Sequence, residues 1–144
     1  MKVQDVPDGY HAVTPYLVVA GAARMIEFLH EAFGAEEIRR FRKPDGIVGH
    51  AEVRIGDSVI MLADACPEFP ATQAGVLLYL SDVDAVYHRA LRAGAKSLRE
   101  PADQFYGDRS ATVRDSWDNW WCISTHIQNL SDEEMQRRAQ ELHG

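Results

Sequence analysis

The sequence has little of what membrane-spanning, secreted or nucleic-acid-binding proteins need. No stretch approaches the roughly 18 consecutive apolar residues that span a bilayer, and the segment Met1–Asp8 has no apolar run such as a signal peptide carries. The 15 Lys and Arg are scattered among 22 Asp and Glu, with a formal net charge of -7. Phosphate binding needs clustered basic side chains. We therefore expect a cytoplasmic protein with no nucleic acid and no membrane as partner.

Cysteine is also scarce. Cys66 and Cys122 are the only two, and their spacing matches no metal-binding motif. In a chain without an export signal they are expected to be reduced thiols. A chain of 144 residues, of which 46% are hydrophobic, can bury a sufficient core without metal or disulfide support. A single globular domain, residues 1–144, is therefore expected.

Two predicted helices with similar ends organise the sequence. Apolar residues at helical spacing indicate helices at 22–33 and 83–93, and each ends at a Gly-Ala pair. The two Gly-Ala pairs lie about 60 residues apart, which indicates an internal duplication. The strand-like segments, rich in β-branched and aromatic residues and bounded by turn-prone pairs, are 13–19, 36–42, 48–55, 58–63, 75–81, 96–101, 110–114 and 119–126.

This order predicts an α+β fold. Two βαβββ modules, at about 11–65 and 75–127, would form a curved mixed sheet around a small-molecule cleft, with 67–74 as linker. A C-terminal helix at about 131–142 follows, with Ser131 as N-cap and Glu134 three residues later as a capping box. The highly charged helix is expected to be solvated; a lid or a dimer contact is the alternative.

A hairpin at Gly56-Asp57 assigns side chains to the two faces of its strands. A tight turn there pairs Ile55 with Ser58 and Glu52 with Met61, and side chains alternate between the faces. One face is apolar enough to pack under a helix. The other holds a mixed set: His50, Glu52, Arg54, Val59 and Met61. Such a face is typical of a ligand cleft, although an ordinary solvent-facing sheet surface can look the same.

The last strand carries adjacent tryptophans that point to opposite faces. Trp121 shares a face with Ile123, whereas Trp120 shares the other with Cys122, Ser124 and His126. Trp117 precedes them in the turn. The three indoles could form a stacking platform for a flat ligand, or they could be core and rim packing.

Several short motifs resemble the PhnB-like branch of the vicinal oxygen chelate superfamily, which includes glyoxalase I, extradiol dioxygenases, and fosfomycin- and bleomycin-resistance proteins. The motifs are Thr14-Pro15-Tyr16-Leu17, Ala32-Phe33-Gly34-Ala35, His50-Ala51-Glu52, Gly56-Asp57-Ser58-Val59-Ile60-Met61-Leu62, Asp82-Val83-Asp84-Ala85 and Gln104-Phe105-Tyr106-Gly107-Asp108-Arg109. The resemblance covers about residues 11–127. It implies the paired βαβββ fold and a homodimer.

The metal chemistry of that superfamily does not carry over. Its metal-dependent members place ligands on the first and last strand of each module, and the resemblance puts Thr14, Met61, Gly75 and Cys122 at those positions. A hard divalent cation prefers imidazole and carboxylate donors. We therefore expect no metal and no cofactor. The last hairpin departs too, because Asp115-Ser116-Trp117-Asp118-Asn119-Trp120 replaces the Asp-Pro-Phe-Gly-His of relatives.

These observations leave more than one function open. The resemblance to bleomycin-resistance proteins implies a binding protein that holds a planar aromatic natural product or drug. Its ligand-binding residues would be Tyr16, Met61, Tyr79, Tyr106, Arg109, Trp117, Trp120, Cys122 and His126. The alternative is a glyoxalase- or dioxygenase-like enzyme, in which His50 acts as general base and Glu52 orients it, with a divalent metal held by these two and His126 as a variant. A third possibility is a cleft without present chemistry.

Overall fold

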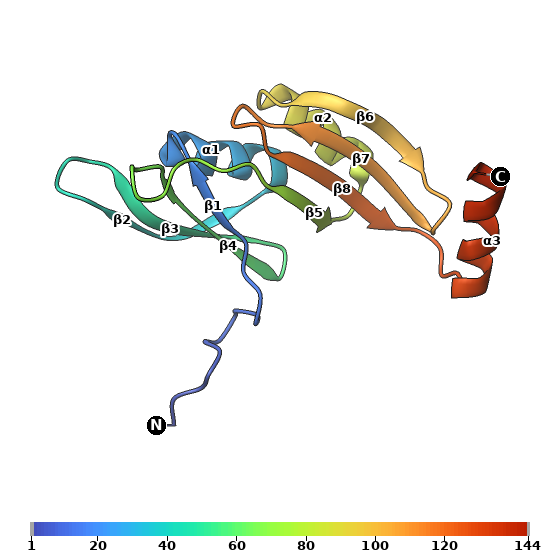
Figure 1. Cartoon of the computed structure of the whole chain (residues 1–144), viewed down its shortest axis with the longest axis horizontal. Coiled ribbons are helices and arrows are strands. Elements are labelled where there is room, and N and C mark those ends of the chain that lie inside the picture. The colour runs from blue at the N-terminus through green and yellow to red at the C-terminus, as the bar shows by residue number, and fades with distance from the viewer. Residues whose placement is uncertain (1, 144) are drawn as a thin grey trace. The chain divides into compact units, whose positions relative to one another are not determined.

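The computed structural model describes residues 2–143. The chain forms two compact units that divide between Ala74 and Gly75. Each unit repeats one order of elements: a strand, a helix and three further strands (Figure 1). The two predicted βαβββ modules are confirmed, whereas the single-domain assignment and the cleft stay predictions.

The first unit contains one helix and a four-stranded mixed sheet. Its elements are β1 (Tyr16–Val19), α1 (Ala22–Phe33), β2 (Glu36–Arg42), β3 (Val48–Ile55) and β4 (Ser58–Asp64). The strand order is β1-β4-β3-β2, in which β1 runs parallel to β4 and the other neighbours are antiparallel. The predicted hairpin register is confirmed, since Ile55 pairs with Ser58 and Glu52 with Met61.

The second unit repeats this topology and adds a terminal helix. Its elements are β5 (Gly75–Tyr79), α2 (Val83–Arg92), β6 (Lys96–Asp103), β7 (Asp108–Arg114), β8 (Trp120–His126) and α3 (Asp132–His143). The order β5-β8-β7-β6 again places a parallel pair, β5 and β8, at one edge. Leu77 pairs with Cys122 as Tyr16 pairs with Met61. Met61 and Cys122 therefore hold equivalent positions, as expected.

Each sheet is covered on one face by its helix. In the first unit Met25 and Leu29 of α1 are fully buried, as are Ala51, Val53 and Leu62 on the helix-bearing face of the sheet. In the second, the buried residues of α2 are Val83, Val86, Tyr87 and Ala90. Burial of apolar side chains at the periods of helix and strand accounts for both cores.

The N-terminus of α1 is capped from another strand. Gly21 stands at the N-cap in a left-handed conformation and has no side chain to offer. Asp64, the last residue of β4, replaces it and accepts from the backbone N–H groups of Gly21 (3.1 Å) and Ala22 (2.7 Å). Its second oxygen accepts from the N–H of Val48 at 2.8 Å. One carboxylate therefore joins α1, β3 and β4.

The turn before β8 is also held by a carboxylate, that of the buried Asp115. Asp115 accepts from the backbone N–H groups of Trp117 (2.8 Å) and Asn119 (2.9 Å), and from the indole N–H of Trp121 (2.8 Å). Asp118 takes the left-handed conformation that the turn requires. Trp121 itself is fully buried, so the prediction that it faces the helix is confirmed.

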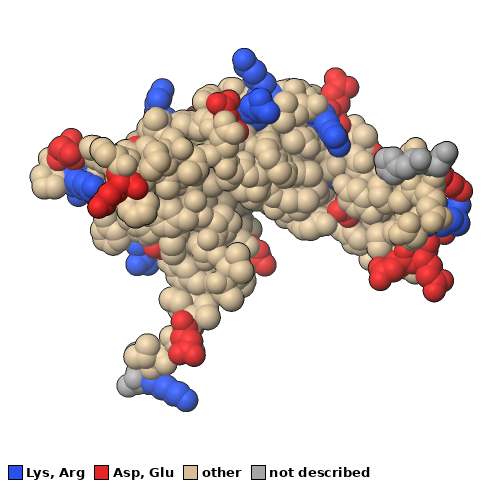
Figure 2. Space-filling model, in the orientation of Figure 1, with Lys and Arg blue, Asp and Glu red and all other residues tan. Residues whose placement is uncertain are grey.

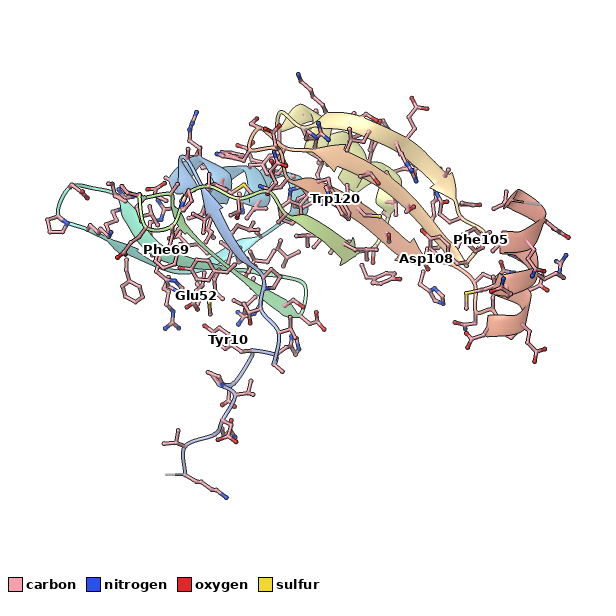
Figure 3. All side chains as sticks on the ribbon, in the orientation of Figure 1. Tyr10, Glu52, Phe69, Phe105, Asp108 and Trp120 are labelled. Carbon is pink, nitrogen blue, oxygen red and sulfur yellow. The ribbon has the colours of Figure 1, made fainter. Side chains whose placement is uncertain are left out.

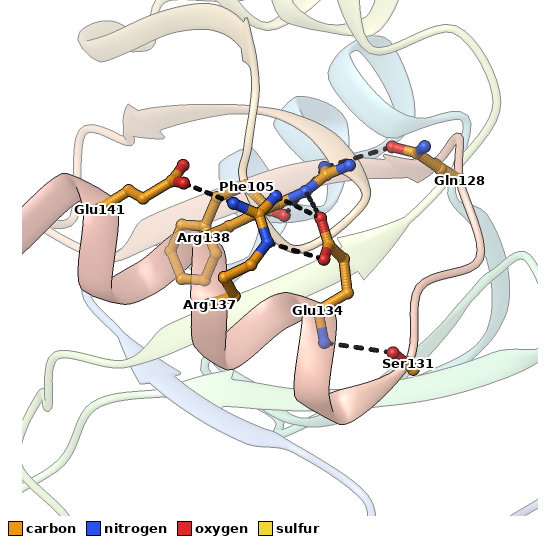
Figure 4. A network of polar contacts seen from close by, with 7 residues as sticks. All are labelled: Phe105, Gln128, Ser131, Glu134, Arg137, Arg138 and Glu141. Atoms are coloured by element: carbon orange, nitrogen blue, oxygen red, sulfur yellow. Dashed lines mark hydrogen bonds and ion pairs between the residues drawn. The ribbon is translucent and has the colours of Figure 1, made fainter.

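The terminal helix α3 attaches to the second unit through arginine (Figure 4). Ser131 caps it by accepting from the N–H of Glu134 at 3.1 Å. The carboxylate of Glu134 pairs with Arg137 (2.6 Å) and Arg138 (3.0 Å), which lowers its pKa to about 2. Arg138 also donates to the carbonyl of Phe105 in the β6–β7 turn at 3.4 Å. The N-cap prediction is confirmed, and α3 is surface-exposed as expected.

Both cysteines are free thiols. Among residues 2–143, no helix has the length and apolar character needed to cross a membrane. On the face shown in Figure 2, lysine and arginine side chains are dispersed among carboxylates rather than gathered together.

Candidate functional site

The predicted site residues fall into groups that belong to different parts of the fold. Tyr16, His50, Glu52 and Met61 share the face of the first sheet that α1 does not cover; we call it the non-helical face of the first unit. The corresponding non-helical face of the second unit carries Leu77, Tyr79, Trp120, Cys122 and His126. Arg109, Tyr106 and Trp117 lie elsewhere in the second unit.

On the first unit, three side chains form a hydrogen-bonded chain. Nε2 of His50 lies 2.7 Å from Oε2 of Glu52, and Nδ1 of the same ring lies 2.9 Å from the hydroxyl of Tyr16. Glu52 is buried, whereas Tyr16 is 48% exposed. His50 and Glu52 lie two residues apart on β3 and therefore share a face of the sheet. Tyr16 lies two strands away on β1, and strand pairing through Met61 of β4 places it on the same face. The predicted proximity of His50 and Glu52 is confirmed.

The other oxygen of Glu52 has two partners that the sequence did not reveal. The Tyr10 hydroxyl donates to Oε1 of Glu52 (Figure 3). Nε of Arg39 lies 3.6 Å from the same oxygen. Burial opposes ionisation of Glu52, but the hydrogen bonds from Tyr10 and His50 and the charge of Arg39 outweigh it, so its pKa is lowered. Glu52 is therefore a carboxylate at neutral pH.

Tyr16, the end member of this hydrogen-bonded chain, lines a pocket of about 450 Å³ in the first unit. Its walls come from β1, β4 and the loop after β4, and its polar members include the side chains of Lys43 and Glu68. The residues that line it are Tyr16, Val18, Lys43, Gly49, Ala63, Asp64, Cys66, Glu68 and Phe69. Of the predicted site residues, only Tyr16 lines it.

On the second unit, the Trp120 indole packs directly against Gly75 of the neighbouring strand β5. A Cβ atom added to Gly75 would lie 2.0 Å from Cζ2 of the Trp120 indole, so only glycine permits this approach. Trp120 is nevertheless 46% exposed, and Leu77 and Tyr79 beside it on β5 are 48% and 63% exposed. The non-helical face of the second unit therefore presents an exposed apolar and aromatic surface, whose side chains stand on the paired strands β5 and β8.

One end of that surface is polar. Asp108, buried at the start of β7, accepts from the Tyr79 hydroxyl at 2.8 Å and pairs with Nδ1 of His126 at 2.8 Å. Nε2 of His126 lies 2.7 Å from Oδ1 of Asn129. The hydrogen bonds to Asp108 and Asn129 raise the pKa of His126. Cys122 lies between this group and Trp120, with its Sγ 3.5 Å from the hydroxyl of Ser124.

Three expected ligand contacts lie away from the non-helical faces. Arg109 points to the helix-bearing face, where it makes a bidentate pair with Asp84 at the start of α2 (2.8 and 3.0 Å) and a third bond to Asp103. Its guanidinium anchors α2 to β7 and is not available to a ligand there. Tyr106 stacks edge-on against Phe105 in the β6–β7 turn. Trp117 is half-buried in the Asp115 turn.

The residues at the four positions that would hold a metal in metal-dependent relatives do not suit a hard divalent cation. Gly75 has no donor and is covered by the Trp120 indole. Thr14, Met61 and Cys122 do not provide the imidazole and carboxylate donors that a hard cation needs. Within residues 2–143, no three His, Cys, Asp or Glu side chains are grouped closely enough to hold a metal ion. The variant with His50, Glu52 and His126 stays a prediction, because its residues come from both units.

The model of the Glyoxalase/Bleomycin resistance protein/Dioxygenase superfamily matches residues 10–123. An uncharacterized protein of Mycobacterium bovis, Mb0911c, is 35% identical over 136 residues, which cover 87% of this chain and 90% of that protein.

Among solved structures, TioX from Micromonospora sp. ML1 has a TM-score of 0.67 at 23% identity, covering 84% of this chain and 100% of TioX. TnmS3, an antibiotic binding protein from Streptomyces sp. CB03234, has a TM-score of 0.65 at 23% identity, with coverage of 81% and 95%. These likenesses support the fold.

Proposed function

Because the chain belongs to the Glyoxalase/Bleomycin resistance protein/Dioxygenase superfamily, we propose that it binds a planar aromatic natural product or drug without the aid of a metal. The observation that carries this proposal is Trp120, an exposed indole packed directly against Gly75. An indole fixed in one orientation loses little conformational entropy when a flat ring stacks on it. Each aromatic pair contributes roughly 0.5–1.5 kcal/mol beyond the burial of area.

The side chains around Trp120 suit such a ligand. Leu77 and Tyr79 extend the apolar surface along β5, and Cys122 adds a small polarizable group on β8. His126, hydrogen-bonded through both ring nitrogens to Asp108 and Asn129 and with a raised pKa that favours its charged form, makes one end of the surface polar. TnmS3, a neighbour in fold, is an antibiotic binding protein, which supports this class of ligand.

The proposal extends to the setting of the protein. On the motifs quoted above, we assign the chain to the PhnB-like branch of the superfamily, to the cytoplasm and to a homodimeric state. In this setting the protein would protect a cell by sequestering its ligand, as an antibiotic-resistance protein does. Tyr106 and Trp117 would line the rim of the ligand site.

Calorimetric titration with a quinoxaline, an anthracycline and bleomycin tests the proposal. Trp120→Ala is expected to weaken binding of the preferred compound about tenfold or more. Gly75→Ala keeps the indole but displaces it, so it should also weaken binding. Leu142→Ala, which truncates an exposed side chain of α3, serves as control and should bind like the original protein. Equal affinities of the Trp120→Ala variant and the original would refute the proposal.

A second candidate function is catalysis by His50 and Glu52. The hydrogen bond of 2.7 Å between His50 and a buried, ionised Glu52 favours it. In such a pair the carboxylate fixes the imidazole tautomer and stabilises a proton taken up by the ring. A proton-transfer reaction, rather than metal-dependent chemistry, is the activity that this pair supports.

A further inference from the structure

Tyr16 connects two features of the first unit. Its hydroxyl lies 2.9 Å from Nδ1 of His50, at the end of the chain that starts at Glu52. Its side chain also lines the pocket of about 450 Å³. Of the three hydrogen-bonded side chains Glu52, His50 and Tyr16, Tyr16 alone lines the pocket and is exposed. A ligand in the pocket would therefore meet the phenol rather than the imidazole.

The ionised Glu52 sets the direction of the hydrogen bonds. A carboxylate can only accept, so in the neutral form of the His50 ring Nε2 carries the proton and donates to Glu52. Nδ1 is then an acceptor, and the Tyr16 hydroxyl must donate to it. The remaining lone pairs of the Tyr16 oxygen are left to accept a proton from a molecule in the pocket, while its own proton can pass to His50.

We infer that Tyr16 is a catalytic acid–base residue that enolises a small aromatic ketone bound in this pocket. This inference rests on the second candidate function, catalysis at His50 and Glu52, and is independent of ligand binding at Trp120. The ligand class follows from the lining: the rings of Tyr16 and Phe69 with Val18 and Ala63 suit a small aromatic molecule, and the Lys43 ammonium suits an oxygen that becomes negative.

The proton transfer is balanced without any further reactant. The C–H bond next to the carbonyl breaks, and its proton goes to the Tyr16 oxygen as the phenol proton goes to Nδ1 of His50. The electron pair of the C–H bond becomes the C=C bond of the enolate, whose oxygen takes the negative charge. The resulting imidazolium is balanced by Glu52. The Tyr16 hydroxyl and His50 N–H protons then exchange with water, and reversal of the steps returns a solvent proton to carbon, so solvent hydrogen is exchanged into the ketone.

One further observation agrees with a relay, and a second concerns the Lys43 side chain that would face the enolate oxygen. Burial, and then the nearby charge of Glu52, raise the pKa of Tyr16, so the free phenol stays protonated and needs an acceptor for its proton. The stem of Lys43 packs on Gly49, where an added Cβ atom would lie 3.4 Å from its Cε. Glu52 and its partners Tyr10 and Arg39 are positioning residues, since they act through His50.

Deuterium exchange into β-tetralone in heavy water, followed by proton NMR at the carbon between its carbonyl and its ring, tests the inference. The original protein should accelerate exchange above buffer, and Tyr16→Phe should reduce that acceleration about a hundredfold. Tyr87→Phe is the matched control, because it also removes one phenol hydroxyl, bonded to Ser97 in the second unit, and should exchange like the original. Thermal melts should show that Tyr16→Phe and His50→Gln are folded.

The other outcomes separate the inference from the function on which it rests. If Tyr16→Phe exchanges at the original rate and His50→Gln does not, His50 contacts the ketone directly; Tyr16 is then not catalytic, although the second candidate function stands. If the original protein gives no exchange above buffer, both fail. Neither result bears on the affinities measured at Trp120.

Discussion

Replacing Trp121 by alanine is expected to destabilise the protein by at least about 4 kcal/mol. The side chain is fully buried against α2, and removal of a buried tryptophan costs about 3–5 kcal/mol through lost burial and the cavity left behind. The variant also deprives the buried Asp115 of an indole donor at 2.8 Å. A hydrogen bond to a charged group contributes about 1.5–3 kcal/mol, although Asp115 keeps its backbone donors.

Two further variants separate these contributions. Trp121→Phe keeps much of the packing and loses the hydrogen bond, so its cost should fall to about 2–3 kcal/mol. Trp120→Ala truncates the adjacent residue, which is 46% exposed on the opposite face, and should change stability by less than about 1 kcal/mol.

Equilibrium urea unfolding followed by circular dichroism measures all three variants without relying on tryptophan emission. A protein of ordinary stability has about 5–15 kcal/mol in total, so Trp121→Ala should unfold at a much lower urea concentration than the original. The reverse order, in which Trp120→Ala is the more damaging change, would refute the assignment of the two faces of β8, and the proposed ligand surface with it.

Three other predictions concern acid stability, metal content and assembly. Asp64→Ala should lower the unfolding free energy by about 2–4 kcal/mol at pH 7. Burial opposes ionisation of Asp64, but its three backbone donors outweigh burial and lower its pKa. The stabilisation is therefore complete above the unfolded carboxyl pKa of about 3.9 and is lost as the pH falls through the lower pKa of the folded state. In acid unfolding titrations the stabilities of the original and the variant should converge. Elemental analysis of protein purified without chelator should find no stoichiometric zinc, nickel, iron or manganese, and one tightly held ion per chain would overturn the metal-free proposal. Sedimentation at micromolar concentration should give a homodimer, and a monomer would contradict it.

The sequence predicted the elements of the fold because their periods are local. The Gly-Ala helix ends, the turn at Gly56-Asp57 and the alternation along β3 and β8 each depend on a few neighbouring residues. From these, the opposite exposures of Trp120 and Trp121 and the pairing of His50 with Glu52 could be predicted. Small errors remained at strand ends, such as the start of β1 at Tyr16 rather than Val13.

Contacts between distant segments could not be predicted in this way. Tyr10 reaches Glu52 from a segment without periodicity, and a register shift in β2 between Glu37 and Arg39 hides the pairing of Arg39 with Glu52. The N-cap residue of α1 is Gly21, which has no side chain, so the cap comes from Asp64, more than 40 residues later in the sequence. No local pattern indicates such a distant partner. Arg109 was expected to contact a ligand, and its place beside the β6–β7 turn did not show that it faces α2. The alternation of side chains along β7 does show it, because Arg109 shares a face with Ala111 and Val113.

The two tryptophans also provide the most direct test of ligand binding. In a proton–nitrogen correlation spectrum each of the three indoles gives its own side-chain N–H resonance, which can be assigned by substitution. During titration with the tightest of the quinoxaline, anthracycline and bleomycin compounds, we expect the Trp120 resonance to shift with the calorimetric affinity. The Trp121 resonance, held at Asp115 in the core, should move little. Binding that leaves Trp120 unchanged would contradict the proposal that its exposed indole holds the ligand.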